Sequence, residues 1–136
     1  NPDDIFLMRR ALKKSGLELP VQIVTDGKQA LDYLEGVGAY GDRHQFPRPA
    51  WVFLDLKLPY VNGFEVLEWI RSDPANRHLD VDILTSSPEE RDKETAQQLG
   101  ARAYLVKPPT VESLLGVFQQ FQPLLSPPQI SQYARL

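Results

Sequence analysis

Residues 51–63 read WVFLDLKLPYVNG, and this stretch decides the fold. It opens with four apolar residues, continues with Asp55 and ends in a turn rich in Pro, Asn and Gly. A short apolar run with β-branched and aromatic residues is typical of a strand buried on both faces, as in a parallel sheet. Such a strand would hold Asp55 at its carboxyl end, where open α/β sheets bind their ligands. Because strand ends often carry polar residues, this strand alone leaves the role of Asp55 open.

The composition is that of an ordinary globular protein. The chain has 136 residues, the usual size of one domain, with 42% hydrophobic and 24% charged residues. A net charge of −3 gives no basic footprint for nucleic acid, and no apolar run approaches the ~18 residues of a membrane span. The absence of cysteine excludes disulfides and thiolate metal sites. The polar start does not resemble a signal peptide, so we expect a cytoplasmic protein without nucleic-acid or membrane partners.

Helical and strand-like patterns alternate along the chain. Apolar spacing predicts helices over 3–15, 26–34, 64–71, 87–99 and 110–121, and strands over 21–24, 51–54, 81–84 and 103–106. Ser87 has the form of a capping box with proline at the first helical position. Asp82 interrupts its strand, and we expect it to face the outside of the sheet. Repeated strand–helix units predict a parallel sheet with helices on both faces.

Two segments lack this periodicity. Residues 35–50 carry Gly, Pro and mixed charge, which predicts a long loop of the kind that is usually functional or mobile. Residues 122–136 form a proline-rich tail with scattered apolar residues, and both an extra contact and a disordered terminus remain open for it. We expect one domain over 1–121, followed by this tail.

Three predicted strands end in polar residues that could meet at one edge of the sheet: Asp55, Thr85 and Lys107. A carboxylate, a hydroxyl and an ammonium group suit phosphoryl transfer, as nucleophile, hydrogen-bond donor and cation for a phosphoryl oxygen. Each also has a simpler interpretation when taken alone. Thr85 could begin the turn that leads to Ser87, and Lys107 could be a solvated lysine. The three together at successive strand ends favour a common site.

The motifs around these residues resemble the receiver domain of bacterial response regulators. They are DLKLP over 55–59 followed by NG over 62–63, LTSS over 84–87, GA over 100–101 and YLVKP over 104–108. The resemblance runs from residue 1 to about residue 121. It implies a flavodoxin-like (βα)5 fold, a doubly wound parallel sheet of strand order 2-1-3-4-5. The long loop and the tail are more particularly similar to stand-alone receivers that partner phytochrome-type histidine kinases.

The resemblance also implies residue roles. Asp55 would accept a phosphoryl group from a kinase histidine, Lys107 would pair with the phosphoryl oxygens, and the Lys107–Pro108 bond would be cis. Thr85 would turn toward the phosphoryl group, and Tyr104 would move inward with it. From its residues alone, Tyr104 is better interpreted as an aromatic side chain placed at the sheet edge for packing.

A divalent cation and two further side chains belong to the same resemblance. Mg²⁺ would bind Asp55 and the backbone carbonyl of Lys57, since hard cations accept oxygen ligands. Lys57 and Ser87 each lie two residues beyond Asp55 and Thr85, at positions that flank the path of the hydrolytic water in this family. We therefore hypothesise that Lys57 and Ser87 tune the lifetime of the phosphoryl group.

One departure concerns the first strand. The family begins with an apolar strand ending in two acidic residues that hold Mg²⁺, whereas this sequence begins at Asn1-Pro2, just after that point. Asp3 and Asp4 would open the first helix instead. A missing middle strand would leave buried ladder groups unpaired at ~1–3 kcal/mol each. Either the chain is trimmed relative to what folds or another segment replaces the strand, and we favour trimming.

These observations favour a single-domain response regulator of a two-component phosphorelay, which is not an enzyme and signals by a conformational change or by dimerisation through its last strand and helices. The alternative is a receiver-like interaction module that takes no phosphate. A phosphatase using an aspartyl phosphate is disfavoured, because that chemistry needs an acid where Lys57 stands. No glycine-rich nucleotide-binding motif is present.

Overall fold

The computed structural model describes residues 2–16, 22–49, 51–58, 60–121 and 134–135. The helices are α1 (Pro2–Ser15), α2 (Gly27–Glu35), α3 (Gly63–Ser72), α4 (Glu90–Gln98) and α5 (Val111–Phe121), with a 3-10 helix η1 (Gly38–Tyr40). The strands are β1 (Gln22–Ile23), β2 (Trp51–Leu54), β3 (Asp80–Thr85), β4 (Tyr104–Val106) and β5 (Ala134–Arg135). The predicted alternation is confirmed, with small shifts at the ends of elements.

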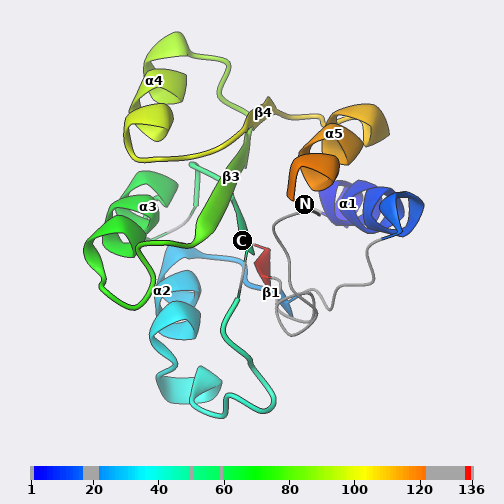
Figure 1. Ribbon diagram of the computed structural model, residues 1–136. Helices are drawn as coiled ribbons and strands as arrows, with labels where there is room; N and C mark the ends of the chain where they lie inside the picture. Colours follow the sequence, from blue (N-terminus) through cyan, green and yellow to red (C-terminus); the bar gives the residue numbers. More distant parts are fainter. Residues whose placement is uncertain (1, 17–21, 50, 59, 122–133, 136) are drawn as a thin grey trace.

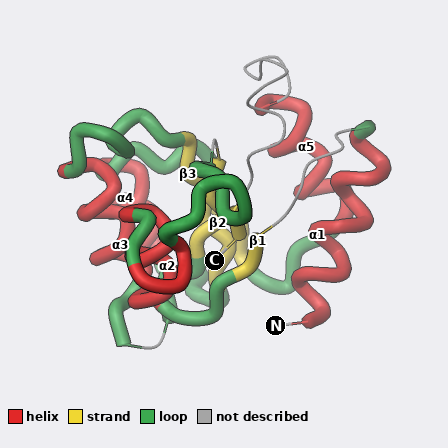
Figure 2. Tube along the Cα trace, turned by 90° about the horizontal axis from the view of Figure 1, so that it is seen from below, coloured by secondary structure: helices red, strands yellow, loops and turns green. Residues whose placement is uncertain are grey.

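The strands form one parallel sheet between two layers of helices. Their order is β1-β5-β2-β3-β4, and every pairing is parallel. Helices α1 and α5 cover one face, and α2, α3 and α4 lie on the other (Figures 1 and 2). This is the doubly wound arrangement that the sequence predicts. Among the described residues, no helix combines the length and apolar character needed to cross a membrane.

Strand β2 is buried on both faces, as its apolar run predicts. Val52 and Leu54 belong to a core shared with α2 and α3, whereas Trp51 and Phe53 belong to a second core shared with α1 and α5. The Trp51 ring lies 5.0 Å from that of Phe53 and 5.1 Å from that of Phe118 in α5. Since side chains alternate between the faces of a strand, this one segment holds both helical layers to the sheet.

The end of the predicted tail joins the sheet, which the sequence pattern did not indicate. Strand β5 pairs with β1 on one side and with β2 on the other (red in Figure 1). In the expected order 2-1-3-4-5, the first strand lies at this position between the second and the third. In the structure β5 occupies this position, whereas the expectation that the chain is trimmed stays a prediction. Residues 122–133, and Val21 of the strand predicted over 21–24, lie outside the described residues.

The prediction that Asp82 faces the outside of the sheet is wrong. Its side chain is fully buried and accepts hydrogen bonds from Trp51 Nε1 at 2.6 Å, Arg102 Nη2 at 3.1 Å and Ala103 N–H at 3.0 Å. A buried carboxylate is tolerated only when donors surround it. Here those donors come from positions far from Asp82 in sequence, which no local pattern reveals.

Most of the loop predicted over residues 35–50 packs against the carboxyl end of α2. It contains η1, and the rings of Tyr33, Tyr40 and Phe46 pack with centroid distances of 5.1 to 6.1 Å. Arg43 donates to the carbonyl oxygens of Leu34 at 3.0 Å and Phe46 at 3.1 Å. These contacts fasten the loop to the carboxyl end of α2.

Candidate functional site

Asp55 directly follows β2 at the carboxyl edge of the sheet, as the sequence predicts. Its side chain is only 16% exposed and that of Lys107 only 20%. Asp55 Oδ2 lies 2.7 Å from Lys107 Nζ, and Oδ1 accepts a hydrogen bond from the Lys57 N–H at 2.9 Å. The structure therefore brings the carboxylate and the ammonium group of the predicted set into direct contact.

Two glycines allow helices to begin close to Asp55. A Cβ atom on Gly63, the first residue of α3, would collide with the Asp55 carbonyl oxygen, and one on Gly27 in α2 would collide with the Val61 carbonyl oxygen. The Gly63 N–H donates to the Leu56 carbonyl oxygen at 3.0 Å. Only glycine permits these approaches. They pack the turn after Asp55 against the amino ends of α2 and α3.

Thr85 ends β3, and Lys107 directly follows the neighbouring strand β4. Thr85 is the last residue of β3 and is fully buried, and its carbonyl oxygen accepts a hydrogen bond from the Lys107 N–H at 2.8 Å. The parallel ladder between β3 and β4 thus sets the two residues side by side. The Lys107–Pro108 bond is cis, as the resemblance implies.

Tyr104 connects β4 to the loop after β3. Its hydroxyl donates to the carbonyl oxygen of Ser87 at 2.8 Å. Burial raises the pKa of Tyr104, and the negative charges of Asp92, Glu89 and Asp55 act in the same direction, while the bond to Ser87 opposes them. The hydroxyl therefore stays protonated as a donor.

The predicted capping box at Ser87 is wrong. Helix α4 begins at Glu90, and the Ser87 hydroxyl donates to Asp92 Oδ2 at 2.6 Å. A capping box pairs residues three apart, whereas Asp92 lies five residues after Ser87. Sequence reasoning missed Asp92 for that reason, although its place in the first turn of a helix favours an acidic residue.

The described residues do not by themselves make a complete cation site. Nowhere in the described part of the chain do three His, Asp or Glu side chains gather at a point that could hold a metal ion. Both oxygens of Asp55, the one carboxylate that the sequence analysis predicts as a ligand, already accept hydrogen bonds. Lys57, whose carbonyl is the other predicted ligand, has an exposed side chain. The acidic pair that the resemblance implies at the end of a first strand is not among the residues that the structure describes.

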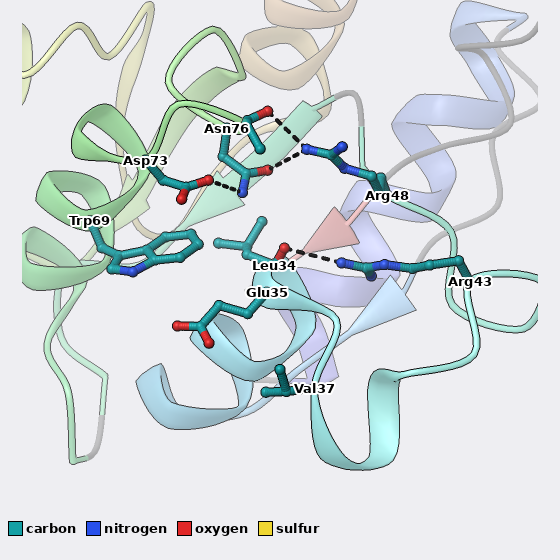
Figure 3. A pocket seen from close by; sticks show the side chains of 9 residues that line it. Leu34, Glu35, Val37, Arg43, Arg48, Trp69, Asp73 and Asn76 are labelled. Atoms are coloured by element: carbon teal, nitrogen blue, oxygen red, sulfur yellow. Dashed lines mark hydrogen bonds between the residues drawn. The ribbon is translucent and has the colours of Figure 1, made fainter.

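A separate pocket lies at the carboxyl ends of α2 and α3, away from Asp55 (Figure 3). It measures about 570 Å³, and Trp69 faces it across from Arg43 and Arg48. Arg48 donates to the Ala75 carbonyl oxygen at 2.8 Å, while Asn76 Nδ2 donates to Asp73 at 2.8 Å. These polar groups bind one another and so connect the loop that contains Arg48 to the segment after α3. The contacts give the pocket a structural role.

Comparison with known proteins points to one family. The model of the response regulator receiver domain matches residues 1–119. Response regulator Rcp1 of Synechocystis is 33% identical over 116 residues, covering 85% of this chain and 77% of that protein. The probable methanogenesis regulatory protein FilR2 of Methanothrix harundinacea is 37% identical over 112 residues, covering 80% and 68%.

Solved structures agree with these relatives. The bacteriophytochrome response regulator RtBRR is 42% identical with a TM-score of 0.76, covering 88% of this chain and 71% of its own. The phosphorylated cyanobacterial phytochrome response regulator RcpA is 33% identical with a TM-score of 0.75, covering 90% and 85%. The Mn²⁺-bound form of Rcp1 is 31% identical with a TM-score of 0.74, covering 90% and 86%. The predicted fold and resemblance are both confirmed.

Proposed function

This chain belongs to the family of response regulator receiver domains, and from that premise we propose that Asp55 accepts a phosphoryl group from a histidine kinase. The observation that carries the proposal is the contact of 2.7 Å between Asp55 Oδ2 and Lys107 Nζ at the carboxyl edge of the sheet. A carboxylate held beside an ammonium group, with fully buried Thr85 ending the next strand, supplies a nucleophile and a cation at one point.

The proposed transfer is a displacement at phosphorus. A P–O bond forms to an Asp55 oxygen while the P–N bond of the kinase phosphohistidine breaks, and its electron pair stays on the imidazole nitrogen. Lys107 already lies beside Asp55, so its ammonium group would stabilise the charge of the transferred phosphoryl oxygens. The chain acts as an acceptor in signalling and not as an enzyme in this proposal.

The proposed readout is a shift between two conformations. Thr85 would move toward the phosphoryl group, and Tyr104 would follow because its hydroxyl is bonded to the same loop through Ser87. We place a homodimer contact on α4, β4 and α5. A phytochrome-type sensor kinase is the partner that the bacteriophytochrome regulators among the relatives suggest, and a cytoplasmic location belongs to the same proposal.

Mg²⁺ is the cation of this proposal, with the Asp55 carboxylate and the Lys57 carbonyl as the described groups that would hold it. A hard divalent cation supplies positive charge to phosphoryl oxygens. The support is the Mn²⁺-bound form of a relative. The alternative is a receiver-like interaction module that takes no phosphate.

Intact mass spectrometry after incubation with acetyl phosphate and Mg²⁺ tests the proposal. We expect the chain to gain the mass of about one phosphoryl group, because Asp55 is the nucleophile. Asp55→Asn should gain none, since the amide is a poor nucleophile of nearly the same size. A folded wild-type chain that gains no mass would instead support the interaction module.

The lifetime hypothesis for Lys57 and Ser87 uses the same mass measurement. After acetyl phosphate is removed, the phosphoryl mass decays at the hydrolysis rate. Lys57 has an exposed side chain near Asp55, where it can affect how the hydrolytic water approaches the phosphoryl group. We therefore expect Lys57→Ala to change the hydrolysis rate by about threefold or more, which corresponds to the energy of one hydrogen bond. Decay at the wild-type rate in both Lys57→Ala and Ser87→Ala would end the hypothesis.

A further inference from the structure

A hydrogen bond between Ser87 and Asp92 ties the loop after β3 to helix α4. Ser87 Oγ donates to Asp92 Oδ2 at 2.6 Å and accepts from the Glu89 N–H at 3.3 Å. Ser87 is only 2% exposed although it lies in a loop, and Asp92 lies in the first turn of α4. A hydroxyl bonded to a carboxylate at this length is among the stronger hydrogen bonds in proteins. The Ser87 hydroxyl proton is therefore used in a bond to α4.

The same serine contacts both residues of the proposed switch. The Ser87 N–H lies 3.5 Å from Thr85 Oγ1, and the Ser87 carbonyl oxygen accepts the Tyr104 hydroxyl at 2.8 Å. Ser87 thus joins the end of β3, the ring from β4 and the start of α4. If Thr85 moves toward a phosphoryl group on Asp55, the loop must stretch the bond from Ser87 to Asp92 or carry α4 along.

We propose that Asp92 is a positioning residue which, through Ser87, stabilises the conformation that the loop has before phosphorylation. The inference rests on the proposed function, because it requires phosphorylation of Asp55. An interaction made in only one of two conformations lowers the population of the other by its own free energy. The conformation in which Thr85 has moved is the one that takes up phosphate in this proposal. Because the bond between Ser87 and Asp92 lowers the population of that conformation, it slows phosphorylation.

The first test measures the phosphorylation rate of the full chain with acetyl phosphate by intact mass. We expect Asp92→Ala to raise the rate roughly three- to tenfold, the shift expected from one net hydrogen bond. Ser87→Ala removes this bond and also the acceptor of the Glu89 N–H, so it should raise the rate at least as much. Adding Asp92→Ala to Ser87→Ala should change the rate little further, because the bond between the two side chains is already lost. Asp92→Asn retains an acceptor oxygen and should restore most of the wild-type rate. Glu90→Ala, which removes an exposed charge from the same turn, should leave the rate unchanged.

The second test is amide hydrogen exchange in the chain without phosphate. Asp92→Ala should speed exchange at Glu89, whose N–H donates to Ser87 Oγ, and not at Val66 in α3, whose N–H donates to the carbonyl oxygen of the N-cap residue Asn62. Faster exchange with an unchanged phosphorylation rate would overturn the inference, because the bond would then order only its own loop.

The two proposals fail differently in these tests. If the wild-type chain takes phosphate and Asp92→Ala takes it at the same rate, the inference about Asp92 is wrong and the proposed function stands. If the folded wild-type chain takes no phosphate on Asp55, the proposed function fails and the inference fails with it.

Discussion

At the scale of single residues, Asp82 shows how a buried charge is accommodated next to the site. Its carboxylate is fully buried and accepts three hydrogen bonds, including one from Arg102, whose guanidinium group also lies 5.9 Å from the centre of the Trp51 ring. These donors come from the start of β2 and from the segment before β4. One side chain of β3 therefore connects β2 and the segment before β4, whose carboxyl ends lead to Asp55 and Lys107.

Removing that carboxylate should destabilise the fold. We expect Asp82→Ala to lower the free energy of unfolding by about 3 kcal/mol, because breaking a buried ion pair leaves the partner without its counter-charge. Urea denaturation at neutral pH measures the loss. Asp82→Asn, which keeps the shape and one acceptor oxygen, should lose less. An alanine variant as stable as wild type would mean that solvent readily satisfies Arg102 and Trp51.

The ionisation of Asp82 gives a pH dependence with a defined sign. Burial raises the pKa of Asp82, and the Arg102 charge and the three hydrogen bonds only partly offset it. The folded state thus binds the proton more tightly than the unfolded state does. Protonated Asp82 therefore contributes its full stabilisation below the pKa of about 4 that Asp has in the unfolded chain. This stabilisation is lost as the pH rises through the pKa of Asp82 in the folded protein. The difference in unfolding free energy between wild type and Asp82→Asn should therefore decrease from acidic toward neutral pH. A difference independent of pH would contradict this assignment.

Single residues also mark what the sequence could not predict. Asp55 and Lys107 were recognisable because each follows an apolar strand, and parallel strands bring their carboxyl ends to one edge. Asp92 was not, because its partner Ser87 lies five residues away, outside any capping pattern. Asp82 was misplaced because its donors Trp51 and Arg102 are distant in the chain.

At the scale of elements, the start of α3 fixes the turn that carries Asp55. We expect Gly63→Ala to lower the free energy of unfolding by about 2 kcal/mol, because the new methyl group meets backbone atoms of Asp55 and Leu56 that cannot move freely. The phosphorylation rate should fall as well, since the turn after Asp55 must shift.

Gly116 in α5 supplies the matched control for that substitution. Nothing lies within 4 Å of a Cβ atom built there, and the residue is exposed within the helix. Gly116→Ala should raise the free energy of unfolding by roughly 0.5–1 kcal/mol, the difference in helix propensity. Urea denaturation of both variants decides the matter. Equal effects would show that Gly63 is replaceable and that α3 does not position Asp55.

At the scale of the whole molecule, strand–helix alternation and two-sided burial of β2 were predictable, because both follow from the local spacing of apolar residues. The strand that lies between β1 and β2 was not. Strand β5 is two residues long and pairs with both β1 and β2, so the position between them is filled from the far end of the chain. Pairing over such a separation depends on which edges are vacant and not on any pattern within residues 122–136.

This arrangement predicts that the last residues carry stability for the whole sheet. Removing residues 134–136 would leave backbone groups of Gln22, Ile23, Val52 and Phe53 without their partner strand. We expect a loss of about 2 kcal/mol, from a few backbone hydrogen bonds worth roughly 1 kcal/mol each, measured as a lower urea midpoint. Ala134→Pro should act in the same direction because proline cannot donate to a ladder, whereas Ala134→Ser should be close to neutral. If truncation left both the midpoint and the amide exchange of Val52 and Phe53 unchanged, β5 would contribute nothing to the stability of the sheet in solution.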